Sequence, residues 1–78
     1  MKIVKIIPQS DWKLTIVADD GRIGVFNVEP YLKYEAFEAL KDIPEFMKVM
    51  NREYFIEWEC GADLSADTID ERMAVIGT

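Results

Sequence analysis

Short runs of mainly apolar residues, separated by turn residues, occupy the N-terminal third of the chain, which predicts β-strands. The stretch KIVKII is rich in β-branched residues and ends at Pro8, so it is expected to form a first strand. The stretch WKLTIVADDGRIGVFNV predicts a hairpin, because Asp20-Gly21 suits a two-residue type I′ turn. The N-terminal part is therefore expected to be a three-stranded antiparallel meander.

The predicted turn also sets the register of the hairpin, with Ile16 opposite Val25 and Leu14 opposite Asn27. One face would then be the core face and would carry Trp12, Leu14, Ile16, Ala18, Ile23 and Val25. The second face would be mixed and would carry Lys13, Thr15, Val17, Gly24, Phe26 and Val28. A second face that is half apolar invites further cover, from a helix or from a second subunit.

Short helices are expected after Pro30. Phe37 and Leu40 are three residues apart, so one helical turn can direct both toward the core. Asp42 followed by Pro44 predicts the start of another helical turn, which carries Phe46.

The stretch KVMNREYFIEWEC predicts a second hairpin with an apolar and a mostly acidic face. The apolar face would carry Tyr54, Ile56 and Trp58, and the other would carry Phe55, Glu57 and Glu59. Cys60 would share the apolar face and be buried, and Gly61 would end the strand. Ser65 is a good N-cap for a last, acidic helix.

That C-terminal helix would carry Asp67 in its first turn, where the helix dipole favours an acid. Ile69 and Met73 would anchor it, and the final AVIGT is expected to be a frayed end. The predicted fold class is α+β, with a small antiparallel sheet and short helices in one domain over residues 1–78.

The net charge of −6 is concentrated in one part of the chain. Residues 1–52 carry eight acidic and eight basic side chains, whereas residues 53–72 carry seven acidic side chains and one basic side chain. Such a surface repels nucleic acid and favours a basic partner, or it only keeps the protein soluble. The sequence also contains no helix-turn-helix segment, so direct DNA binding is not expected.

Other features indicate a cytoplasmic protein. A lone cysteine cannot form an internal disulfide, which fits a reducing compartment. No apolar run approaches the roughly 20 residues that cross a bilayer, and the start lacks the features of a signal peptide. We therefore expect no membrane partner.

The order of these motifs resembles a bacterial family known as domain of unknown function 2442. The most specific part of the resemblance is Trp58 followed by Gly61, Ala62, Asp63, Leu64 and Ser65, then Asp67-Thr68. Earlier pieces are Asp20-Gly21, Phe26-Asn27-Val28, Pro30-Tyr31-Leu32, Phe37, Leu40-Lys41-Asp42, Phe46 and Val49. Two departures are small: many members have aspartate in place of Asn27, and Ile43 displaces the proline that follows Asp42.

The resemblance implies no established activity, cofactor or catalytic residue. Members are often encoded beside a small protein of another uncharacterised family, domain of unknown function 4160, in an arrangement that looks like a toxin–antitoxin pair. By that resemblance the chain would be the antitoxin-like partner.

Two classes of function remain open. The first is a non-enzymatic interaction module for a small basic protein partner, with a homodimer as a further option. Its candidate interaction residues are Glu57, Glu59, Asp67, Asp70, Glu71, Tyr31 and Tyr34. The second class is a metal- or small-molecule-dependent enzyme that uses the Asp63 and Asp67 region. An accessory role in transcription through a DNA-binding partner is a variant of the first class.

The second class has little support from residue types. The chain has no histidine, so Cys60 and the serines have no imidazole base, and a lone cysteine falls short of a zinc site. Asp63, Ser65, Asp67 and Glu71 only partly match a calcium loop. Capping of the helix by Ser65 and Asp67, with Asp63 in the turn after Gly61, explains them better. We therefore expect no enzyme, no cofactor and no metal.

Overall fold

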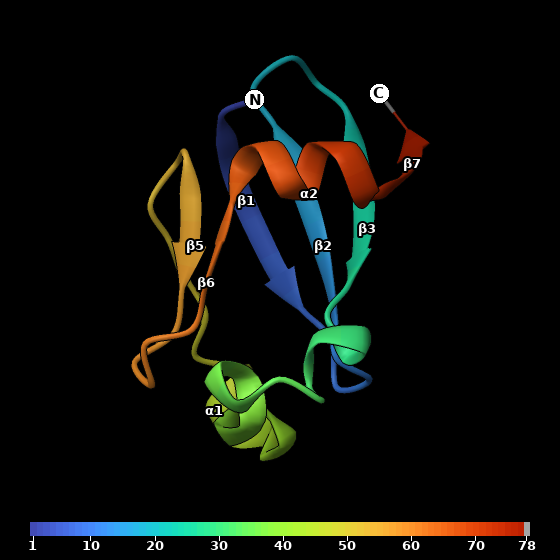
Figure 1. Ribbon diagram of the computed structural model, residues 1–78. Coiled ribbons are helices and arrows are strands. Elements are labelled where there is room, and N and C mark those ends of the chain that lie inside the picture. The colour runs from blue at the N-terminus through green and yellow to red at the C-terminus, as the bar shows by residue number, and fades with distance from the viewer. Residues whose placement is uncertain (78) are drawn as a thin grey trace.

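The computed structural model describes residues 1–77 and shows an α+β domain with two antiparallel sheets. The larger sheet has the order β1-β2-β3-β7 and the smaller one the order β4-β5-β6 (Figure 1). The strands are β1 (Ile3–Pro8), β2 (Lys13–Ala18), β3 (Ile23–Asn27), β4 (Met50–Asn51), β5 (Phe55–Glu57), β6 (Asp63–Ser65) and β7 (Ala74–Gly77). The helices are the 3₁₀ helices η1 (Glu29–Tyr31) and η2 (Glu35–Lys41), and the α-helices α1 (Ile43–Phe46) and α2 (Ala66–Arg72).

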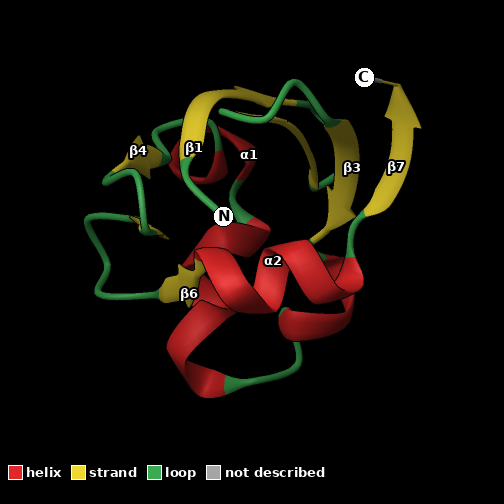
Figure 2. Cartoon of the chain, turned by 90° about the horizontal axis from the view of Figure 1, so that it is seen from above, coloured by secondary structure: helices red, strands yellow, loops and turns green. Residues whose placement is uncertain are grey.

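The larger sheet curves around the core. In Figure 2 its strands form an arc, and α2 lies on the inner side of that arc. The inner side chains are fully buried, among them Ile3, Leu14, Ile16 and Ile69. No helix of residues 1–77 covers the outer side of the arc, where Thr15, Val17 and Val25 are half-buried.

The predicted meander is confirmed, but its predicted register is wrong by one residue. Leu14 pairs with Phe26 and Ile16 with Gly24, because the loop has three residues, Asp19 to Gly21, and not two. Within this loop, Gly21 is the one residue with a positive φ, of 91°. Its N–H donates to the carbonyl of Ala18 at 3.1 Å. A one-residue shift turns every side chain of a strand over, so the core face carries Gly24, Phe26 and Val28 in place of Ile23 and Val25.

The loop between β5 and β6 repeats this geometry. Gly61 has a φ of 96°, and its N–H donates to the carbonyl of Trp58 at 2.9 Å. The predicted burial of Cys60 is therefore wrong: the strand alternation stops at Trp58, and Cys60 is exposed in the turn.

The helical predictions are confirmed between Pro30 and Met73. Phe37 and Leu40 are buried on η2, where a spacing of three residues matches one 3₁₀ turn. Phe46 is buried on α1, and Ser65 caps α2 by accepting a hydrogen bond from the N–H of Thr68 at 3.1 Å. None of these helices in residues 1–77 is long and apolar enough to cross a membrane.

The predicted frayed end is wrong for residues 74–77, which form β7 and pair with β3. Met73 is buried at 8% exposure and holds the end of α2 against β3, so the chain re-enters the sheet directly after the helix. Thr78 lies outside the described residues.

Both tryptophans fasten the helical segment to the sheets. Trp12 lies half-buried at a φ of 62°, just before β2, and its indole N–H donates to the carbonyl of Leu40 at 2.7 Å. Trp58 is buried, and its indole N–H donates to the carbonyl of Phe46 at 2.8 Å. Each bond satisfies a carbonyl at the end of a short helix, where no further helical turn is available to do so.

Candidate functional site

The candidate acidic residues lie in three separate places. Glu57 is on β5 and pairs with Arg52 at 2.9 Å, and Glu59 is exposed in the turn that follows. Asp67, Asp70 and Glu71 are on α2. Asp70 pairs with Arg22 at 2.7 Å, whereas no ion pair within residues 1–77 involves Asp67 or Glu71.

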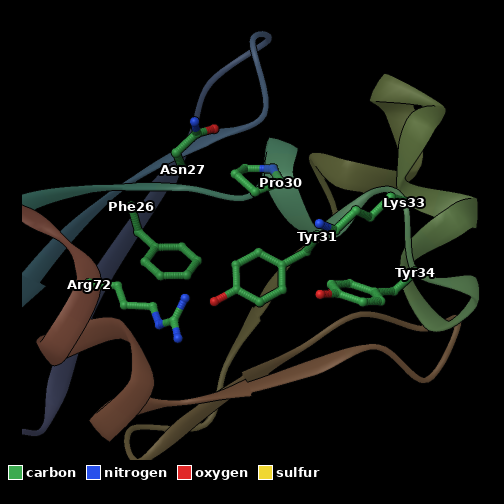
Figure 3. A pocket seen from close by; sticks show the side chains of 7 residues that line it. All are labelled: Phe26, Asn27, Pro30, Tyr31, Lys33, Tyr34 and Arg72. Carbon is green, nitrogen blue, oxygen red and sulfur yellow. The ribbon is translucent and has the colours of Figure 1, made fainter.

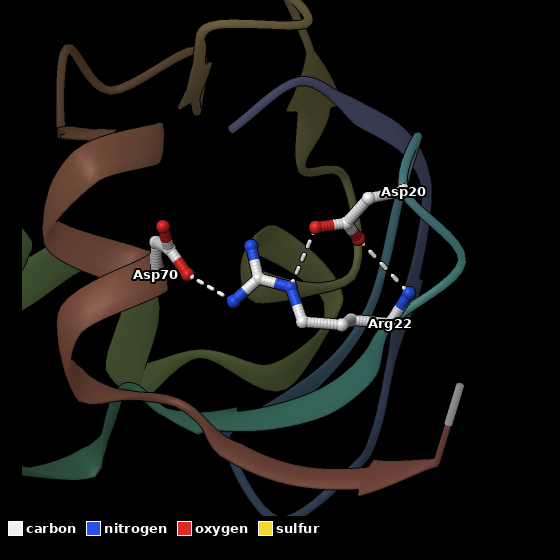
Figure 4. Close-up of polar contacts among 3 residues, drawn as sticks. All are labelled: Asp20, Arg22 and Asp70. Atoms are coloured by element: carbon white, nitrogen blue, oxygen red, sulfur yellow. Dashed lines mark hydrogen bonds and ion pairs between the residues drawn. The ribbon is translucent and has the colours of Figure 1, made fainter.

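Arg22 connects the first hairpin to α2 (Figure 4). Its Nη1 donates to Asp70 at 2.7 Å, and its Nε donates to Asp20 at 2.8 Å. The backbone N–H of Arg22 also donates to Asp20, at 3.0 Å. That backbone bond and the guanidinium lower the pKa of Asp20 below its ordinary value of 3.8, and the two carboxylates raise the pKa of Arg22. Arg22 and Asp70 therefore serve the fold, and they are not free to bind a partner without losing this contact.

Asp20 should make the stability of the domain depend on pH in the acid range. Because the folded-state pKa lies below 3.8, the contribution is present above that pH and is lost as the pH falls through the folded-state pKa. We expect Asp20→Asn to flatten the acid limb of a plot of unfolding free energy against pH, measured by urea denaturation. Asp19→Asn, next to it in the same loop, is the matched control and should keep the wild-type slope.

The motif residues of the second sheet build the structure. Trp58, Ala62 and Leu64 are buried, and Gly61 makes the turn. Asp63 and Ser65 are exposed on β6, opposite Glu57 and Phe55 of β5. Asp63 and Asp67 do not gather with another acid or Cys60 into a group of three that could hold a metal within the described part of the chain.

Exposed aromatic side chains lie beside some of these acids. The predicted place of Tyr54 on the apolar face is wrong, because Tyr54 lies in the turn just before β5 and is 64% exposed. Phe55, the first residue of β5, is 40% exposed. Asp63 lies on the adjacent strand, and α2 begins at the same end, where the N–H of Ala66 donates to the carbonyl of Tyr54 at 2.9 Å. These residues lie close together along the backbone of β5, β6 and the start of α2, and we call Tyr54, Phe55, Glu57, Asp63 and Asp67 the aromatic–acidic face.

A second feature is an open pocket of about 410 Å³ between the end of β3, η1 and the end of α2. Its lining consists of Phe26, Asn27, Pro30, Tyr31, Lys33, Tyr34 and Arg72. Figure 3 shows the hydroxyl groups of Tyr31 and Tyr34 on the side of the pocket where the Arg72 guanidinium lies. Lys33 lies over the ring of Tyr34, with its Nζ 5.3 Å from the ring centroid.

Sequence reasoning selected only the two tyrosines of this pocket. Arg72 could have been noticed, because it is the single cation of the acidic segment 53–72. Lys33 carried no signal, and Asn27 was noted only as a departure from the family pattern. Only the tertiary fold brings the end of β3 beside the end of α2.

Comparison with known proteins gives one result. Neither a search of curated proteins nor a search of solved structures returned a match. A family model, described as protein of unknown function (DUF2442), matches residues 3–72, from the start of β1 to the end of α2. The chain belongs to this family of unknown function, DUF2442.

Proposed function

We propose that the chain is a non-enzymatic protein-interaction module that binds a basic partner protein through the aromatic–acidic face. The observation that carries this proposal is the exposure of Tyr54 and Phe55 next to carboxylates. Tyrosine and phenylalanine supply large contact areas in interfaces, and nearby acids provide complementarity to a basic surface.

The two acids of this face that have no cation partner within residues 1–77 are Asp63 and Asp67. They can meet a partner's lysine or arginine without breaking an internal ion pair. Glu57 already shares its charge with Arg52, so we expect it to contribute less. Asp70 is not part of this face, because its carboxylate already pairs with Arg22.

An antitoxin-like role is one form of this proposal, and its partner would be a small basic protein. In this form the partner would dock on the aromatic–acidic face, where Asp63 and Asp67 have no cation partner within residues 1–77.

The test is affinity capture from the native host at low salt, with a variant that removes one aromatic and one acid from the face. In the variant Tyr54→Ala/Asp63→Lys we expect loss of a stoichiometric basic protein that the wild type retains and that rising salt releases. The control Met47→Ala/Glu38→Lys removes an exposed apolar side chain and an exposed acid from the η2–α1 segment, and it should retain the partner.

Both variants should unfold at the wild-type temperature, because all four positions are exposed. Equal capture by wild type and face variant, or recovery of the chain alone, would show that this face is not the binding surface.

A further inference from the structure

The pocket between β3, η1 and α2 has a charge opposite to that of the whole chain. Its lining includes two cations, Lys33 and Arg72, and no carboxylate, although the net charge of the chain is −6. Neither cation takes part in an ion pair within residues 1–77. A guanidinium presents a planar fork of donors that matches a carboxylate, so Arg72 is suited to bind an anion.

Neutral hydrogen-bonding groups also line the pocket. The hydroxyl groups of Tyr31 and Tyr34 point to the side of Arg72 in Figure 3, and neither makes a hydrogen bond within the described residues. The Oδ1 of Asn27 accepts from the N–H of Glu29 at 3.1 Å, which leaves its amide NH₂ as a donor. The side-chain groups left for a ligand, namely the two tyrosine hydroxyls, the Asn27 amide and the two cations, can therefore all donate a hydrogen bond to an anion.

Rings form the rest of the wall. The ring centroids of Phe26 and Tyr31 are 5.8 Å apart, and those of Tyr31 and Tyr34 are 6.4 Å apart. Pro30 adds another flat apolar surface. A ligand ring can pack against such walls, and the volume of about 410 Å³ lies within the range of small-molecule sites.

We propose that this pocket binds a small aromatic carboxylate, with Arg72 holding the carboxylate and the tyrosine rings packing against the ligand's ring. The pocket shares no residue with the aromatic–acidic face. The ligand proposal is therefore tested independently of the proposed interaction with a basic partner.

The test is a titration of ¹⁵N-labelled protein followed by NMR, with benzoate as the probe. Benzoate should shift the amides of residues 26–29, residues 31–34 and Arg72 in a saturable manner. Benzamide has nearly the same shape without the charge, and inorganic phosphate has charge without a ring. Benzamide and phosphate should each bind at least about tenfold more weakly than benzoate. Benzamide lacks the charged contact with Arg72, and phosphate lacks a ring to pack against the tyrosines.

Arg72→Gln should weaken benzoate binding by about tenfold, the usual effect of removing a charged hydrogen-bond partner. Lys5→Gln removes one positive charge from β1, which does not line the pocket, and it should bind as the wild type does. Thermal unfolding establishes that both variants are folded, which is expected for two exposed side chains.

Three results would overturn the proposal: no saturable shift at these amides, equal affinity for benzoate and benzamide, or wild-type affinity in Arg72→Gln. Phosphate that binds as tightly as benzoate would overturn the aromatic part, since the site would then recognise charge alone.

Discussion

Replacement of Trp58 by alanine should lower the free energy of unfolding by several kcal/mol and shift the urea midpoint to a much lower concentration. Trp58 is 2% exposed, lies stacked on Phe46 at 6.0 Å between centroids, and meets Phe37 edge-on at 6.3 Å. Removing a buried tryptophan costs about 3–5 kcal/mol. A domain of this length has a total unfolding free energy of about 4–12 kcal/mol, so the loss is a large part of the whole.

The hydrogen bond of Trp58 can be separated from its packing. Trp58→Phe keeps a ring in the core but removes the donor to the carbonyl of Phe46, and we expect it to cost about 1–3 kcal/mol. Urea denaturation followed by far-ultraviolet circular dichroism measures both variants without relying on tryptophan fluorescence.

The control for Trp58→Ala is Tyr54→Ala, which removes an aromatic side chain that is 64% exposed. It should change the unfolding free energy by about 0.5 kcal/mol or less. If the two variants had the same urea midpoint, Trp58 would not hold β5, η2 and α1 together as the structure indicates.

Gly24→Val should destabilise the protein by about 1–3 kcal/mol, the usual cost of overpacking a core. Gly24 lies on β3 opposite Ile16 and Val75. A Cβ atom placed there would lie 2.6 Å from the Sδ of Met73 and 2.9 Å from its Cγ. The absence of a side chain at Gly24 is therefore what allows Met73 to pack on the sheet between α2 and β7.

A double-mutant cycle tests this contact directly. Met73→Ala alone removes a buried side chain and should cost about 2–5 kcal/mol. In the Gly24→Val background the same change also relieves the overlap, so we expect it to cost at least about 0.5 kcal/mol less than in the wild type. Strictly additive losses in urea denaturation would contradict direct packing of Met73 on Gly24.

Gly77→Val is the matched control for Gly24→Val. Gly77 also lies on a paired strand, opposite Ile23, but a Cβ atom there would meet no other atom within 4 Å. Valine favours extended strands, so the change should leave the stability unchanged or raise it slightly.

The sequence alone determined the features that depend on neighbours along the chain. β-Branched residues before Pro8 predicted β1, and alternation predicted β2, β3 and β5. A spacing of three residues predicted the helical turn with Phe37 and Leu40, and Ser65 marked the start of α2. These features follow from local periodicity and capping, which need no knowledge of distant residues.

Only the tertiary structure decided the hairpin register, the strand β7 and the pocket. An Asp-Gly pair fits both a two-residue turn and the observed three-residue loop, and the choice depends on which face of β3 the core accepts. The exposed residues Val75 and Ile76 carry no core pattern, so their strand forms because Met73 brings them to the edge of β3. Arg72 and Tyr31 line one pocket although they are distant in sequence, since that contact is made by packing α2 against the end of the sheet.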